Sequence, residues 1–134
     1  MSDATTTVAA LKESMRRFAA ARGWEPYHSP KNLVMALASE VGELCDLFRW
    51  LTADESRAAV ADPRTREAVA DELADVANIV FLLSSHTGID LAGAIRAKAA
   101  KNAIKYPAPA APSGEGGGGG GGTPESDVRQ PPTA

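Results

Sequence analysis

The sequence predicts an all-α protein whose four long helices form a four-helix bundle-like fold. Apolar residues recur at helical spacing over four segments, and each segment begins or ends at a proline, a glycine or a capping residue. No run of alternating apolar and polar residues, the pattern typical of a half-buried strand, stands out along the chain. We expect the helices at residues 8–22, 30–51, 63–88 and 90–107.

The first two helices are separated by a segment that we expect to be neither helix nor strand. Gly23 follows the first helix as a C-terminal cap, because glycine adopts the left-handed conformation there without strain. Residues 24–32 are polar and broken by proline. Ser29 followed by Pro30 indicates the start of the second helix, with proline at the first position, where its missing N–H is not needed.

Capping patterns also define the later elements. Thr52 with Glu55 three residues on is a capping box, which predicts a short connecting helix after the second long one. Asp62 followed by Pro63 begins the third long helix. Pro107 closes the fourth, because proline cannot continue a helix.

Composition and charge exclude several classes of partner. The net charge is −3 with acidic and basic residues interspersed, so the chain has no basic face for nucleic acid. Cys45 is the only cysteine, which excludes an intrachain disulfide and suits a reducing compartment. The longest apolar run is far shorter than a membrane span, and the N-terminus lacks the layout of a signal peptide. We expect a cytoplasmic protein with no nucleic-acid and no membrane partner.

The chain divides into a folded domain and a tail. It has 134 residues, and from residue 108 onward proline and glycine dominate, with a glycine run at 116–122 and Val128 as the only large aliphatic residue. Such a segment buries too little apolar surface to offset its ordering entropy. We expect one domain over residues 1–107 and a disordered Pro/Gly-rich tail over 108–134. Because a domain of this size has a small core, homo-oligomerisation is a natural supplement.

Two pairs of carboxylates lie in the middle of predicted apolar helix faces. Glu40 and Glu43 are on the second helix, and Glu72 and Asp75 are on the third. Residues three apart lie about 60° apart around a helix axis, so each pair presents two carboxylates together. Glu40 and Glu72 each fall within the leucine-, valine- and isoleucine-rich stripe that its helix should bury. We expect the two stripes to meet and to gather the four acids in one partly dry place.

Four carboxylates gathered in this way need a positive partner, because unpaired buried charges are costly and like charges raise that cost. A divalent cation with oxygen ligands is the simplest partner, and we expect Mg²⁺, with Mn²⁺ as an alternative. Salt bridges to lysine or arginine are the other explanation, but few basic residues on these two helices can reach the acids. A di-iron site of the ferritin kind is disfavoured, since it needs Glu-x-x-His pairs that neither helix has.

The arrangement Glu-x-x-Glu, then 28 residues, then Glu-x-x-Asp resembles the signature of the all-α nucleoside triphosphate pyrophosphohydrolase superfamily. The closer resemblance is to its MazG-like, dCTP-pyrophosphatase branch. The segments that carry it are Trp-Glu-Pro-Tyr-His-Ser-Pro-Lys-Asn at 24–32, Ala-Ser-Glu-Val-Gly-Glu-Leu at 38–44, Leu-Phe-Arg-Trp at 47–50, Asp-Glu-Leu-Ala-Asp-Val at 71–76 and Lys-Ala-Ala-Lys-Asn-Ala-Ile-Lys-Tyr-Pro at 98–107. Together they span most of the predicted domain.

The resemblance implies a Mg²⁺-dependent enzyme that hydrolyses a nucleoside triphosphate between its α and β phosphates to a monophosphate and pyrophosphate. The implied substrate is dCTP or a modified dCTP, and the implied role is house-cleaning of the nucleotide pool. Relatives are usually dimers or tetramers whose sites are shared between subunits, so the resemblance also implies a homo-oligomer.

The candidate catalytic residues are Glu43, which could orient or deprotonate the attacking water, together with Lys98 and Asn102. Lys98 and Asn102 share one face of the fourth helix with Leu91 and Ile95. We therefore expect them to face the core, where pyrophosphate oxygens would pair with them. The predicted substrate-binding residues are Trp24, His28, Trp50, Lys98, Asn102, Lys105 and Tyr106. The two tryptophans could instead anchor the core or an interface, the histidine could cap a loop, and the last lysine could simply be solvated.

Two departures from the family pattern leave the base preference open. Relatives often carry a tyrosine near the place where this chain has Asn78-Ile79, and some carry a histidine where it has Met15. A phosphoribosyl-ATP pyrophosphohydrolase is the second hypothesis, because it shares the carboxylate layout, although residues 24–32 favour the first. A non-catalytic helical oligomerisation module is the hypothesis of another class. The four carboxylates, present together with Lys98 and Asn102, disfavour it.

Overall fold

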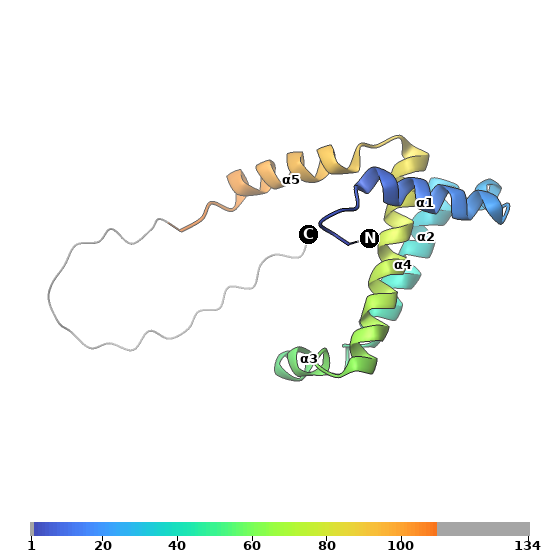
Figure 1. Cartoon of the computed structure of the whole chain (residues 1–134). Helices are drawn as coiled ribbons and strands as arrows, with labels where there is room; N and C mark the ends of the chain where they lie inside the picture. The colour runs from blue at the N-terminus through green and yellow to red at the C-terminus, as the bar shows by residue number, and fades with distance from the viewer. Residues whose placement is uncertain (1, 110–134) are drawn as a thin grey trace, which may run out of the picture.

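The structure, a computed structural model, describes residues 2–109 and is built of helices, with no strand in that part of the chain (Figure 1). The elements in chain order are α1 (Val8–Ala21), the short 3₁₀ helix η1 (Glu25–Tyr27), α2 (Pro30–Asp46), α3 (Ala53–Ala59), α4 (Pro63–Thr87) and α5 (Leu91–Lys105). The all-α prediction is confirmed. Residues 110–134 lie outside the described residues, so the disordered tail over 108–134 and the domain boundary at 107 stay predictions.

The long helices α2 and α4 lie side by side and run in opposite directions, because α3 and its flanking turns reverse the chain between them (Figure 1). Side-chain caps mark where each helix starts. The Ser29 hydroxyl accepts the N–H of Asn32 at 3.2 Å, and the Asp62 carboxylate accepts the N–H of Thr65 at 2.9 Å. Such caps satisfy backbone donors that a helix start leaves free. The sequence thus specifies where both helices of this central pair begin.

Helix α1 packs on α4, at the end of the pair where α2 starts (Figure 1). The buried apolar side chains of the described residues are Ala19 of α1 and Leu33 of α2, which are 2% and 3% exposed. Lys12 Nζ donates to Ser84 Oγ at 2.9 Å and to the carbonyl oxygen of Ile89 at 3.3 Å. The Ser84 hydroxyl donates to the same carbonyl at 2.8 Å. These hydrogen bonds tie α1 to the C-terminal end of α4.

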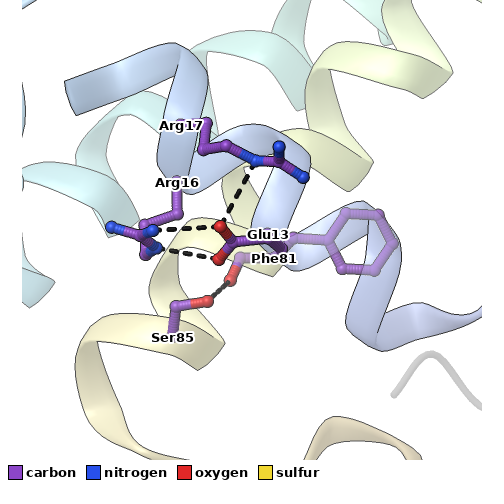
Figure 2. A network of polar contacts seen from close by, with 5 residues as sticks. All are labelled: Glu13, Arg16, Arg17, Phe81 and Ser85. Carbon is purple, nitrogen blue, oxygen red and sulfur yellow. Dashed lines mark hydrogen bonds and ion pairs between the residues drawn. The ribbon is translucent and has the colours of Figure 1, made fainter. Parts of the chain in front are cut away.

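The solvent face of α1 carries a network of ion pairs (Figure 2). The Glu13 carboxylate accepts from Arg16 Nε at 2.9 Å and lies 3.3 Å from Arg17 Nε, and the hydrogen bond from Arg16 lowers the Glu13 pKa. These side chains are 43% to 73% exposed, so water screens the contacts and they contribute little to stability. Figure 2 also shows the Ser85 hydroxyl of α4 donating to the Phe81 carbonyl one turn earlier. Packing and the buried hydrogen bonds, rather than surface ion pairs, hold α1 in place.

Two segments differ in detail from the prediction. Helix α2 ends at Asp46 rather than near residue 51, because the N–H groups of Phe48 and Arg49 both donate to the Cys45 carbonyl and begin a series of turns. Within residues 24–32, expected to be irregular, N–H groups donate to carbonyls three residues earlier and form the single turn of η1. The capping box before α3 is confirmed.

Helix α5 is the largest difference from a compact bundle. It extends away from α1, α2 and α4 after the turn at Gly88, instead of packing as a fourth helix of the same chain (Figure 1). Two of its apolar residues, Ile95 and Ile104, are 58% and 84% exposed. Helical periodicity predicts an apolar face but not the surface that covers it. Within residues 2–109, no helix combines the length and apolar character needed to cross a membrane.

Two glycines give a test of this backbone. Gly88 ends α4 with φ at 69°, a left-handed conformation that costs an alanine about 1 kcal/mol. Gly42 lies inside α2 with nothing within 4 Å of an added Cβ, so alanine there should stabilise the helix by about 0.5–1 kcal/mol. We expect urea unfolding to show that Gly88→Ala lowers, and Gly42→Ala raises, the free energy of unfolding. A loss at Gly42 would contradict the open space around it.

Candidate active site

The structure brings carboxylates of α2 and α4 together in one cluster. One carboxylate oxygen from each of Glu40, Glu43 and Glu72 can be chosen so that all three lie within 4.8 Å of one another. Asp75 is outside that set, but it lines the same cavity as Glu40. The meeting of the two helix faces expected from their periodicity is therefore observed. The catalytic and metal-binding roles of these residues stay predictions.

Burial and neighbouring negative charges disfavour the ionised forms of two carboxylates in the cluster, Glu40 and Glu72. Burial raises the pKa of the Glu40 carboxyl, and the other three carboxylates raise it further. Burial likewise raises the pKa of Glu72, and the charges of Glu43, Asp75 and Asp71 add to the effect. Both shifts have the sign expected when desolvation and like charges disfavour the ionised form. At neutral pH the ionised cluster therefore opposes the packing of α2 on α4.

No cation of the described residues neutralises this charge. The ion pairs between residues 2 and 109 link Glu13, Asp46 and Asp54 to arginines three or four residues further along the chain, and none involves the cluster. Glu72 Oε2 is buried without a hydrogen-bond partner. Structural salt bridges therefore do not explain why these acids face one another. Hard metal ions prefer oxygen ligands. This acid cluster, with its unpartnered buried oxygen, could therefore hold a metal ion.

A cavity of about 450 Å³ extends from the acids along the α2–α4 pair. Glu40 and Asp75 line one end of it. Because the helices are antiparallel, Leu33 of α2 and Leu82 of α4 line the other end. From Glu40 to Leu33 the helix rises about 10 Å at about 1.5 Å per residue. The cavity is thus elongated, with carboxylates at one end and an apolar lining toward the other.

Aromatic side chains from α1 and from the residues that flank η1 close the far end of the cavity. Phe18 and Trp24 meet edge to face with ring centroids 5.7 Å apart, and Trp24 and His28 do so at 6.5 Å. All three line the cavity. The guanidinium carbon of Arg22 lies 3.4 Å from the Phe18 ring centroid, and Arg22 Nη1 donates to the Phe18 carbonyl at 3.2 Å. These contacts hold the aromatic wall in one arrangement.

His28 is the titratable group at this aromatic end. Burial lowers its pKa, the nearby His86 lowers it further, and the negative charge of Glu25 raises it. The two imidazole rings lie 5.7 Å apart, edge to face. The Nδ1 atom of His28 is buried and has no hydrogen-bond partner. A neutral imidazole is therefore available to a ligand in the cavity.

Five of the predicted substrate-binding residues do not reach the cavity within one chain. Trp50 lies beyond the end of α2, is 82% exposed, and has the Arg49 guanidinium 5.0 Å from its ring centroid. The other four, all exposed, are on α5 or directly after it, and they are Lys98, Asn102, Lys105 and Tyr106. The cavity lining comes from α1, the segment around η1, α2 and α4. Their functional roles stay predictions.

The orientation expected for Lys98 and Asn102 is wrong for the single chain. The helical wheel placed both on the core side of the fourth helix, yet both are exposed. The physical reason is that α5 has no helix of the described chain to pack against, so its Ile95 face is open to solvent as well.

Several residues that line the cavity are not among the predicted site residues, including Phe18, Tyr27, Asn32 and Leu82. Phe18 lies at helical spacing from Met15, a pattern that indicates a core-facing stripe and cannot distinguish a filled core from a cavity wall. Asn32 lies in the segment at residues 24–32 that carries the family resemblance, but its side-chain contact depends on η1, an element that the sequence does not predict. The Asn32 amide donates to the Tyr27 carbonyl at 2.9 Å and so joins the two elements.

The chain is similar in sequence to known proteins. A family model described as MazG-like matches residues 35–116. Human dCTP pyrophosphatase 1 is 42% identical over 100 residues, an alignment that covers 72% of this chain and 59% of the human protein. The bovine dCTP pyrophosphatase 1 is 39% identical over 99 residues, covering 71% and 59%. This chain thus spans about three fifths of the length of these curated relatives.

The fold also resembles a solved structure. A pyrophosphatase from Archaeoglobus fulgidus superimposes with a TM-score of 0.69 and 35% sequence identity, covering 73% of this chain and 90% of that protein. The family match includes both acidic pairs and α5. The chain therefore belongs to the MazG-like family.

Proposed function

We propose that the protein is a Mg²⁺-dependent nucleoside triphosphate pyrophosphohydrolase that converts dCTP or a modified dCTP, with water, to the monophosphate and pyrophosphate. One observation carries the proposal: a single cavity has carboxylates at one end and aromatic side chains at the other. A nucleotide has the same order, with charged phosphates at one end and a flat base at the other. Relatives named dCTP pyrophosphatase 1 support the choice of substrate.

The aromatic end suits a nucleobase. The rings of Phe18 and Trp24 offer flat apolar surfaces, and stacking on such rings is a general way to hold bases. His28 adds a neutral ring whose buried Nδ1 lacks a partner, so it can hydrogen-bond to the base edge. Met15 and Ile79 complete apolar walls of the cavity. This set of residues would bind the base by stacking with few polar contacts.

The acid end suits the triphosphate only with a cation present. Glu40, Glu43, Glu72 and Asp75 are the proposed ligands of Mg²⁺, with Mn²⁺ as an alternative, because hard cations prefer oxygen ligands. When bound, the ion would offset charge on the phosphate oxygens and lower the pKa of a bound water. Of the three glutamates that converge, Glu43 is the exposed one, and we assign it to accept a hydrogen bond from the attacking water. Water would then attack the α-phosphorus in line with the departing pyrophosphate, and the bond from that phosphorus to the α–β bridging oxygen would break.

The proposed enzyme is a homo-oligomer, a dimer or a tetramer. Helix α5 exposes apolar side chains, and an apolar groove lies between α2 and α4, lined by Leu44, Phe48 and Leu73. Contact with a second copy of the chain would remove these apolar surfaces from water. If α5 packs against a second copy, Lys98 and Asn102 gain the apolar surroundings that one chain does not supply. They would then be available to bind pyrophosphate oxygens. Trp50, Lys105 and Tyr106 are exposed in the same way and would join the substrate site across the interface.

The acid cluster gives the decisive test of activity. Glu40→Gln, Glu43→Gln, Glu72→Gln and Asp75→Asn should each lower Mg²⁺-dependent pyrophosphate release from dCTP by orders of magnitude, because each removes a charged ligand. Glu67→Gln is the matched control, since Glu67 is an exposed acid on α4 outside the cluster, and it should keep full turnover.

The assay should compare dCTP, 5-modified dCTP, other nucleotides and phosphoribosyl-ATP, with both products scored. Full turnover in Glu40→Gln or Glu72→Gln would refute the metal role. Preference for phosphoribosyl-ATP would move the assignment to the second hypothesis. No turnover of any nucleotide would favour a non-catalytic module.

The same cluster predicts how stability depends on pH without metal. The pKa of Glu72 is raised in the folded state above the ordinary value of 4.5, so the folded protein binds its proton more tightly than the unfolded chain. The free energy of unfolding therefore falls as pH rises through the raised pKa, and the loss persists at neutral pH. In EDTA at about pH 7, Glu72→Gln should melt at or above the wild-type temperature, and the difference should shrink toward the ordinary pKa.

Added Mg²⁺ should raise the melting temperature of the wild type more than that of Glu72→Gln, because ligands stabilise the state that binds them. If Glu72 served a structural salt bridge, the amide would instead destabilise the metal-free fold at neutral pH.

The oligomer is tested by light scattering. We expect a dimer or tetramer at micromolar concentration, and we expect Leu73→Glu to dissociate it, because a charge in the apolar groove must stay hydrated. Arg64→Glu is the control, since that exposed residue lies about 180° from Leu73 around α4. A wild-type monomer with full turnover would contradict a shared site.

A further inference from the structure

Asn78 is a polar side chain of the cavity that has no role in the scheme above. Asn78 of α4 is half-buried and lines the cavity beside Ile79. The side-chain hydrogen bonds of α4 within the described residues are made near its two ends, and none involves Asn78. The Asn78 amide can donate through its nitrogen and accept through its oxygen. It can therefore pair with a polar group of a ligand that occupies the cavity.

The position of Asn78 along the cavity indicates which group that is. It lies three residues beyond Asp75, which is about 4.5 Å along the helix axis from the acid end toward the aromatic end. On α2, Ala36 lines the same cavity four residues before Glu40, about 6 Å along that axis. The methyl side chain of Ala36 leaves room in the middle of the cavity. Asn78 is thus the polar group between the carboxylates and the apolar end.

The middle of a bound nucleotide is its sugar. With phosphates at the acid cluster and the base at Phe18 and Trp24, the sugar lies between them, beside Asn78. In a deoxynucleoside triphosphate the 3′-hydroxyl is the only free hydroxyl of the sugar, because the 5′-oxygen carries the phosphates. Leu33, Ala36 and Ile79 around it offer no side-chain hydrogen bond. A 3′-hydroxyl that entered this region would lose its water partners unless Asn78 replaced them.

We propose that Asn78 is a specificity-determining residue that hydrogen-bonds to the 3′-hydroxyl of the bound nucleotide, an inference that rests on the proposed function. The amide oxygen can accept from the hydroxyl and the amide nitrogen can donate to it, so one contact satisfies both groups. A site built to pair with a hydroxyl discriminates against an analogue that lacks it, because the protein group is then left unpaired. The enzyme should therefore discriminate against 3′-deoxygenated nucleotides.

The test combines a change in the protein with a change in the substrate. Wild type and Asn78→Leu are each assayed with dCTP and with 2′,3′-dideoxy-CTP. We expect the wild type to prefer dCTP by about tenfold or more in kcat/KM. Asn78→Leu keeps a similar volume without the amide, so its preference should fall below about twofold, with the loss confined to dCTP. Calorimetric binding of dCMP and 2′,3′-dideoxy-CMP should show the same pattern without turnover.

Two further variants make the test specific to the hydrogen bond. Ile79→Val alters the neighbouring cavity wall without removing a polar group, so the ratio between dCTP and its dideoxy analogue should stay as in the wild type. Asn78→Ser replaces the amide by a shorter side chain that does not reach as far, and it should lose the preference even if Asn78→Leu does not fold. A preference of wild-type size in either folded Asn78 variant overturns the proposal.

Failure of this inference can be separated from failure of the proposed function. If the wild type hydrolyses dCTP and its dideoxy analogue equally well, the role of Asn78 is refuted and the pyrophosphohydrolase activity stands. If the wild type neither hydrolyses these nucleotides nor binds their monophosphates, both proposals are refuted.

Discussion

The packing of α2 on α4 is the contact on which the rest of the molecule depends. It is also a contact in which two forces oppose each other. Near the start of α2 the helices bury Leu33, and α1 adds Ala19 to the same small core. Further along the pair, Glu40, Glu43 and Glu72 meet, and desolvation and like charges raise the free energy of the charged forms of Glu40 and Glu72. Apolar burial at one end therefore holds uncompensated charge in place at the other.

This opposition links stability to ligands. Within residues 2–109 the buried apolar side chains are Ala19 and Leu33, which make a small core, while large apolar residues such as Ile95 and Ile104 are exposed. A cation at the acids would remove repulsion, and a second copy against α5 would cover apolar surface. Both would stabilise the folded state by mass action. In the proposed function, the groups that make the single chain incomplete are the same groups that bind metal, substrate and partner.

The sequence predicts the acid cluster better than the substrate site, for a physical reason. Glu40 and Glu72 could be placed together because each lies on an apolar stripe, and the two longest stripes of a small helical protein have few surfaces to cover except each other. Lys98 lies on an equally regular helix, but periodicity does not predict which surface covers a helix face. Helix α5 extends away from α1, α2 and α4, so its predicted core-facing side is open. Met15 and Phe18 show a second limit. Their spacing indicates burial, and hydrophobicity does not distinguish a filled core from a cavity.

The proposed metal ligands and the proposed base-binding residues lie on different elements of the fold. The carboxylates all lie on the α2–α4 pair, whereas Phe18, Trp24 and His28 lie on or next to α1 and η1. The α1–η1 segment has its own attachments, since Lys12 ties α1 to the end of α4 and the N–H of Trp24 donates to the Ala19 carbonyl at 3.0 Å. A substitution in the aromatic wall can therefore change the fit of a base without displacing the acids. In such an architecture base preference can change while the phosphate chemistry stays constant.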